Sequence, residues 1–73
     1  MQLENGKKYR ISFSSGSSDL IYIILEHCGG DWYKTAAYFM PDKPESKKEG
    51  IERSKTNPTY INIAHACSLN ILD

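Results

Sequence analysis

The sequence predicts a small all-β protein, and three observations lead to that prediction. Apolar and polar residues alternate in several short segments, as is typical of half-buried strands. Turns rich in glycine or serine separate these segments. The 73 residues are enough for one domain, 1–73, and no more. Five short strands around one small core close best as a barrel, because closure removes exposed strand edges.

The first two strands are predicted from contrasting patterns. Tyr9, Ile11 and Phe13 alternate with polar residues, which indicates a strand with one buried face. The segment SSGSSD, residues 14–19, then predicts a turn, because Ser and Asp side chains hydrogen bond to their own backbone. Leu20–Leu25 is a continuous apolar run with three isoleucines. We expect either a central strand that packs on both faces or a strand that bends hard around a small core.

The third strand, Trp32–Phe39, follows a tight turn at Gly29–Asp31. Neighbouring side chains on a strand point to opposite faces. One face is therefore expected to carry Trp32, Lys34, Ala36 and Tyr38, and the other Tyr33, Thr35, Ala37 and Phe39.

Two further strands, Thr59–Ile63 and Cys67–Ile71, complete the predicted set, with a single 3₁₀ turn or a kink at Ala64–Ala66 between them. The segment 40–58 before them holds all three prolines and many charges and has no strand period. It predicts one long loop between strands 3 and 4, and such a loop is often functional. A short helical turn around Glu45–Arg53 is an alternative, which Gly50 disfavours.

Two segments of the chain resemble SH3-type barrels. Residues 19–37, DLIYIILEHCGGDWYKTAA, are similar to the family's central hairpin, an apolar strand ending in Leu-Glu, a turn and then Gly-Asp-Trp-aromatic-Lys-Ala. Residues 59–73, TYINIAHACSLNILD, are similar to its closing segment, in which a strand enters a 3₁₀ turn before a last apolar strand. The resemblance implies an SH3-like barrel with Trp32 in a ligand groove, Asn62 at the family's groove proline and His65 at its groove tyrosine.

Composition excludes several classes of protein. The formal net charge is zero, so no overall attraction to nucleic acid or to an anionic membrane is expected. The longest apolar run, Leu20–Leu25, is far shorter than the ~20 residues of a membrane span. The start MQLENGKKYR lacks the apolar region of a signal peptide. We therefore expect a cytoplasmic protein with two reduced, buried cysteines and no membrane partner.

No chemical site is predicted. Zinc ligands could come from His27, Cys28, His65 and Cys67, but adjacent residues on a strand point apart and the usual Cys-x₂-Cys pair is missing. A Cys28–Cys67 disulfide is an alternative only for an exported protein. Cys28, His65 and Asp31 form no local catalytic motif. We expect no metal, no cofactor and no enzymatic activity.

The aromatic residues favour a binding module that acts through protein–protein contact, because Trp and Tyr anchor interfaces. The predicted partner-binding residues are Trp32, Tyr33 and Tyr38, with Asn62 and His65 beside them. The alternative for Trp32 is that its ring plugs the barrel mouth. The partner would be another protein, and the chain an adaptor, an assembly factor or a small inhibitor; its size suits a phage or bacterial accessory protein.

Two other functions stay open at this point. Lys7, Lys8 and Arg10 on the first strand, joined by Lys34, could bind the phosphates of single-stranded nucleic acid, as in Sm-like or cold-shock-like proteins. A homo-oligomer could instead sequester a small ligand such as a nucleotide between its subunits. The fold alone does not choose among these functions.

Overall fold

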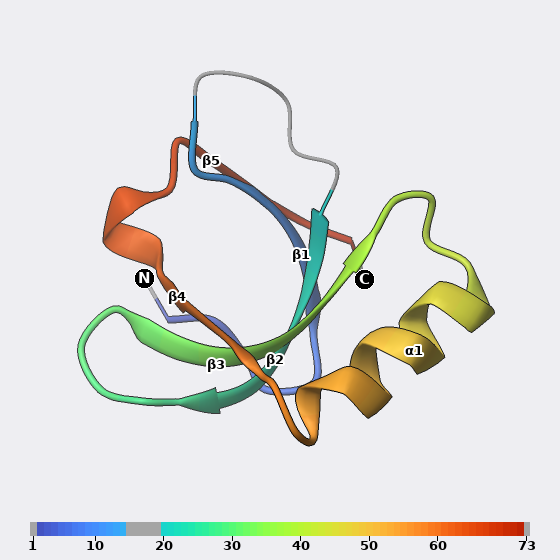
Figure 1. Cartoon of the computed structure of the whole chain (residues 1–73). Coiled ribbons are helices and arrows are strands. Elements are labelled where there is room, and N and C mark those ends of the chain that lie inside the picture. The colour runs from blue at the N-terminus through green and yellow to red at the C-terminus, as the bar shows by residue number, and fades with distance from the viewer. Residues whose placement is uncertain (1, 15–19, 73) are drawn as a thin grey trace.

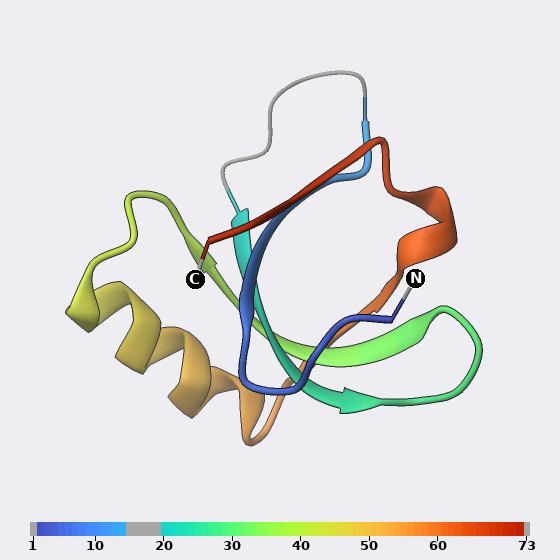
Figure 2. The ribbon, with the colours of Figure 1, turned by 180° about the vertical axis from the view of Figure 1, so that it is seen from behind.

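The computed structural model describes residues 2–14 and 20–72, which form one five-stranded sheet and one α-helix (Figures 1 and 2). The strands are β1 (Lys8–Ser12), β2 (Leu20–His27), β3 (Trp32–Phe39), β4 (Thr59–Asn62) and β5 (Ser68–Ile71). The helix α1 (Pro44–Ser54) joins β3 to β4, and the 3₁₀ helix η1 (Ile63–His65) joins β4 to β5. The mostly β fold and its five strands are confirmed. The predicted turn at 14–19 lies, beyond Ser14, outside the described residues.

The sheet is open, which corrects the expectation of a closed barrel. Its strand order is β4-β3-β2-β1-β5, and all neighbouring strands are antiparallel. The sheet curls strongly, but β4 and β5 do not pair, so both are edge strands (Figure 1). The chain bends away from the line of β4 at Asn62, whose side chain accepts a hydrogen bond from the Ala64 N–H at 2.9 Å. It then crosses through η1 to pair with β1.

The core lies on both faces of the central strand β2, as its continuous apolar run predicts. Inside the curl, Tyr22 and Ile24 belong to a cluster with residues of the N-terminal segment and of β1, β3 and β4: Leu3, Tyr9, Ile11, Tyr33 and Ile61. On the other face, Ile21 and Ile23 pack with Ala36, Tyr38, Leu25 and Ile51. Two small cores therefore share one strand, and α1 covers the second of them.

The helix α1 replaces most of the predicted long loop. Pro44 stands at its start, where its fixed φ suits a helix and its missing N–H is no loss. The face toward the sheet carries the small residues Ser46, Gly50 and Ser54, spaced by four, beside the partly buried Ile51. Arg53 Nη2 also donates a 2.9 Å hydrogen bond to the backbone carbonyl of Ala37 in β3. Because this face is small rather than apolar, the usual periodicity of a helix is missing from the sequence.

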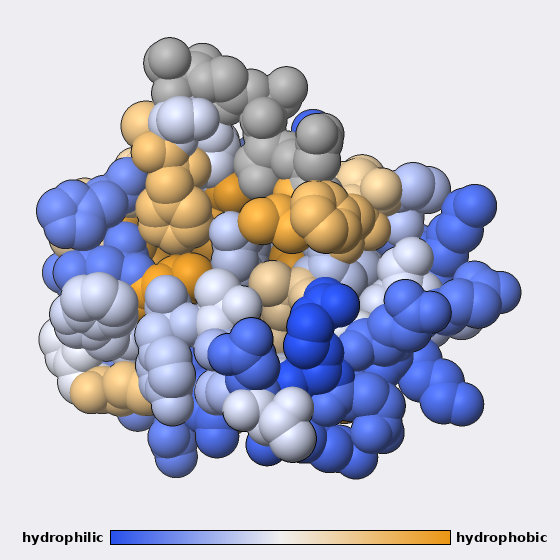
Figure 3. Space-filling model, viewed as in Figure 1, coloured by the Kyte–Doolittle hydropathy of each residue, from blue (hydrophilic) through white to orange (hydrophobic). Residues whose placement is uncertain are grey.

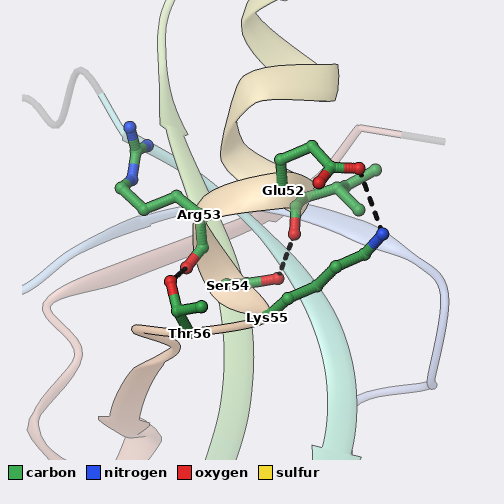
Figure 4. Close-up of polar contacts among 6 residues, drawn as sticks. Glu52, Arg53, Ser54, Lys55 and Thr56 are labelled. Carbon is green, nitrogen blue, oxygen red and sulfur yellow. Dashed lines mark hydrogen bonds and ion pairs between the residues drawn. The ribbon is translucent and has the colours of Figure 1, made fainter.

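The end of α1 is held by local polar contacts (Figure 4). The Ser54 hydroxyl donates to the Ile51 carbonyl at 2.6 Å, and Lys55 pairs with Glu52 at 3.0 Å. The backbone N–H groups of Thr56 and Asn57 both donate to the Arg53 carbonyl. These bonds satisfy carbonyls that a helix end would otherwise leave without donors.

Replacing Gly50 with alanine should destabilise the protein. An added Cβ would lie 2.9 Å from the Ala37 carbonyl oxygen and 2.9 Å from the Tyr38 Cβ, so the helix must shift away from β3. Overpacking of this kind costs about 1–3 kcal/mol, which exceeds the gain of up to about 1 kcal/mol in helix propensity. Urea unfolding of Gly50→Ala beside wild type measures the difference. The neighbouring exposed substitution Glu49→Ala is the control, and an equal stability of both variants would contradict the close packing.

Asp42 joins three parts of the chain at the start of the β3–α1 connection. Its carboxylate accepts a 2.6 Å hydrogen bond from the Tyr38 hydroxyl and pairs with the Lys8 ammonium of β1 at 2.6 Å. The Lys8 ammonium, and after it the Tyr38 hydroxyl, holds the pKa of Asp42 below its ordinary value. The ionised carboxylate therefore favours the folded state.

This contact should make stability depend on pH in the acid range. Because the folded-state pKa of Asp42 is lowered, its contribution is complete above the ordinary pKa of about 3.9 and is lost as the pH falls through the folded-state value. Asp42→Asn should therefore be less stable than wild type at neutral pH, and the gap should narrow below about pH 4. Urea titrations at a series of pH values test this. Asp31→Asn, at an exposed turn position, is the control, and a gap that is independent of pH would refute the assignment.

Candidate binding groove

An open groove of about 350 Å³ runs beside the edge strand β4. All four residues of β4 contribute to it, together with residues from β2, β3 and η1 and one residue just after β1. Its lining comprises Phe13, Tyr22, Trp32, Thr59, Tyr60, Ile61, Asn62 and His65. In Figure 3, orange and pale atoms lie on the side of β4, with blue atoms at the outer side of η1, whereas blue atoms predominate over α1. The groove is therefore an aromatic and weakly polar surface on a molecule whose helix is strongly hydrophilic.

Trp32 is held at the groove by the β2–β3 turn and by β4. Gly29 and Gly30 have φ values of 99° and 56°, a region that favours glycine, and the turn closes with a 3.1 Å bond from the Trp32 N–H to the Gly29 carbonyl. Trp32 lies opposite Asn62 in the β3–β4 register. Its side chain is 50% exposed. The turn thus places the half-exposed Trp32 indole next to the start of η1.

Two further aromatic residues frame the groove. Tyr60 on β4 is 56% exposed, and Phe13 after β1 is 38% exposed. Phe13 meets the buried Tyr22 edge to face, with ring centroids 6.0 Å apart. Burial raises the pKa of Tyr22, so its hydroxyl stays neutral at physiological pH. Tyr22 and the buried Ile61 form the less accessible part of the lining.

The structure brings together three of the five predicted partner-binding residues. Trp32, Asn62 and His65 all line the groove. Tyr33 and Tyr38 do not, because both are 1% exposed, which corrects the expectation that they anchor a contact. The Tyr33 ring lies in the interior cluster, and Tyr38 lies in the cluster that α1 covers.

Sequence reasoning missed Phe13, Tyr22 and Tyr60 as members of this set. The alternation of Tyr60 with the buried Ile61 is a local pattern that could have placed the Tyr60 ring outside. No local pattern could have brought Phe13 to β4, because the two are far apart along the chain and meet only through the curl of the sheet.

The predicted basic residues do not gather at the groove. None of Lys7, Lys8, Arg10 and Lys34 belongs to its lining. The Lys8 ammonium pairs with Asp42, and Lys34 lies opposite Glu26 in the register of β2 and β3. Two of these four cations therefore have a carboxylate nearby, which lowers the positive electrostatic potential that a phosphate would meet.

The residues weighed as metal ligands or nucleophiles have other environments. Cys28 and Cys67 are both exposed free thiols, which corrects the expectation that they are buried. The His27 ring stacks on Tyr33 at 4.8 Å, and its Nε2 lies 2.8 Å from the Gly30 carbonyl oxygen. Across residues 2–14 and 20–72, no three His, Cys, Asp or Glu side chains are placed to hold a metal ion. That same part of the chain has no helix with the length and apolarity to cross a membrane.

Comparisons with protein-family models, with curated proteins and with solved structures found no match for this chain.

Proposed function

We propose that this chain is a non-enzymatic, SH3-like binding module that docks a segment of another protein in the β4 groove. The observation that carries the proposal is the exposure of three large aromatic side chains, Phe13, Trp32 and Tyr60, around one groove. Exposed aromatic rings that converge on a concave surface are typical of interaction sites. Adaptor, assembly factor and small inhibitor are the roles that such a module can fill.

The SH3-like assignment is supported by the order of the elements that carry the resemblance. The hairpin of β2 and β3 places Trp32 at the start of β3, and β4 leads into η1 and then β5. The positions that the resemblance assigns to a ligand groove, Trp32, Asn62 and His65, line one groove here. The open sheet and the helix α1 are the departures from a simple barrel.

A display selection tests the proposal. Random linear peptides are selected on the wild-type chain without reference to any variant. The enriched peptides are then titrated against wild type and Trp32→Ala by calorimetry at low and high salt. Enriched peptides whose affinity changes little with salt support a peptide-binding groove.

Single-stranded DNA and RNA oligonucleotides and a nucleotide mixture are titrated in parallel. Steep loss of oligonucleotide binding with salt would contradict the proposal and favour the nucleic-acid alternative. A nucleotide-dependent rise in melting temperature with oligomer formation would favour ligand sequestration.

A further inference from the structure

We propose that the occupant of the groove is an extended segment of a partner protein that adds a sixth strand to the free edge of β4, in register with Tyr60. This inference rests on the proposed function, because it names how the groove holds its partner. It goes further in assigning part of the affinity to the backbone of β4, and not only to the aromatic side chains.

The direction of the backbone groups of β4 follows from one hydrogen bond at its C-terminal end. The Ile63 N–H donates to the Asp31 carbonyl at 2.9 Å, and Tyr33 lies opposite Ile61 in the same register. In an antiparallel pair, hydrogen-bonded positions alternate with positions whose N–H and C=O point away from the partner. Ile61 and Thr59 therefore bond to β3, whereas Tyr60 and the Asn62 N–H point to the free edge.

Nothing in the described ranges 2–14 and 20–72 pairs with that edge. β4 is the last strand of the sheet and has β3 as its one neighbour. The backbone hydrogen bonds outside the regular ladders include none from Tyr60 or Asn62 N–H. An open strand edge with unpaired donors and acceptors is a template for another strand.

The groove lies along this same edge. Its lining includes every residue of β4 together with Phe13 and Tyr22, which approach from the β1 and β2 side. A strand laid against β4 would therefore lie between Tyr60 and Phe13, with alternate side chains entering the groove. Pairing opposite Tyr60 supplies two hydrogen bonds, and the Asn62 N–H supplies a third.

The lining also defines the chemistry of the added strand. It holds no carboxylate, no lysine and no arginine, and its polar side chains are hydroxyl, amide and imidazole groups. Charged side chains buried there would lack partners, at a cost in affinity. The segment is therefore an uncharged one, with aliphatic or aromatic residues at alternate positions and a free N–H opposite Tyr60.

Two measurements on the full chain test whether the partner segment adds a strand to β4. The probe is a linear peptide from the selection described above, and each of its residues is N-methylated in turn. If the peptide binds as a strand, N-methylation should weaken binding at every second residue only, by about fivefold or more per hydrogen bond lost. If N-methylation is tolerated at every position, or if the selected peptides share a proline-rich consensus, strand addition is overturned. The groove would then recognise side chains alone.

The second measurement uses a matched pair of variants. Tyr60→Ala removes the ring and keeps the N–H, whereas Tyr60→Pro removes both, at an edge position whose N–H does not bond to β3. Tyr60→Pro should bind the peptide at least about fivefold more weakly than Tyr60→Ala. Equal affinities overturn the inference. Should Tyr60→Pro not fold, as judged by NMR, the N-methyl series decides alone.

Failure of the inference and of the proposed function can be told apart. If no peptide prefers the wild type over Trp32→Ala, both are refuted. If peptides bind without alternation in the N-methyl series, only strand addition is refuted. If the chain without peptide is a dimer whose Tyr60 and Asn62 amides are protected from hydrogen exchange, a second copy occupies the edge and the inference is wrong.

Discussion

The Tyr33→Ala protein is expected to be largely unfolded at room temperature. Tyr33 is 1% exposed at the centre of the interior cluster, its ring stacks on His27, and its hydroxyl accepts a 3.0 Å hydrogen bond from the Leu3 N–H. Truncating a buried aromatic residue costs about 3–5 kcal/mol. A core in a domain of this size supplies only about 3–5 kcal/mol of stability, so the loss consumes most of the margin.

Circular dichroism and urea unfolding measure the effect, and two variants control for it. Tyr60→Ala makes the same truncation at a 56% exposed position on the neighbouring strand and should stay within about 0.5 kcal/mol of wild type. Tyr33→Phe keeps the ring and leaves the Leu3 N–H without its acceptor, at a cost of about 1–3 kcal/mol. A cooperative Tyr33→Ala transition at the wild-type midpoint would show that Tyr33 is not central to the core.

Trp32→Ala should weaken binding of the selected partner segment by about 30- to 1000-fold, with little change in stability. A central tryptophan in an interface contributes about 2–4 kcal/mol to binding when truncation is the measure. The side chain is half exposed in the free protein, so its removal leaves little cavity in the core. Isothermal calorimetry gives the affinity, and urea unfolding gives the stability.

Phe39→Ala is the matched control for Trp32→Ala. Phe39 ends the same strand, is 66% exposed and does not line the groove. The Phe39→Ala variant should bind the segment with the affinity of wild type. Equal losses in the two variants would mean that the contact covers β3 as a whole, and normal binding by both would remove Trp32 from the site.

Alternation along the strands explains which parts of this architecture could be predicted from sequence. The bounds of β3 and the double-sided burial of β2 follow from local patterns of apolar residues. So does the break at η1, between two short strands. These features depend only on residues close together in the sequence, and the periodicity of apolar residues reports on such residues.

The helix was underestimated because its buried face carries no apolar pattern. Gly50 counts against a helix when propensity alone is considered. In the folded chain the lack of a side chain at Gly50 is what lets α1 approach β3, with Ala37 and Tyr38 beneath it. Helix propensity therefore disfavours glycine at position 50, whereas the packing of α1 against β3 favours it.

The burial of tyrosines on β3 could not be predicted for a related reason. Trp32 and Tyr38 occupy the same face by alternation, yet one is 50% exposed and the other 1%. The α1 helix covers the Tyr38 end of that face together with Ile51, and leaves the Trp32 end open. The sequence favours a loop over the alternative helical turn at Glu45–Arg53, so it does not predict that α1 covers Tyr38.

The position of the only tryptophan gives the protein an optical reporter of its own. A half-exposed indole emits at long wavelength already in the folded chain, so denaturation should shift its emission spectrum only slightly. A segment seated in the groove would remove water from the same indole and shift its emission to the blue. In this chain, unlabelled tryptophan fluorescence should therefore report occupancy of the groove more sensitively than it reports folding.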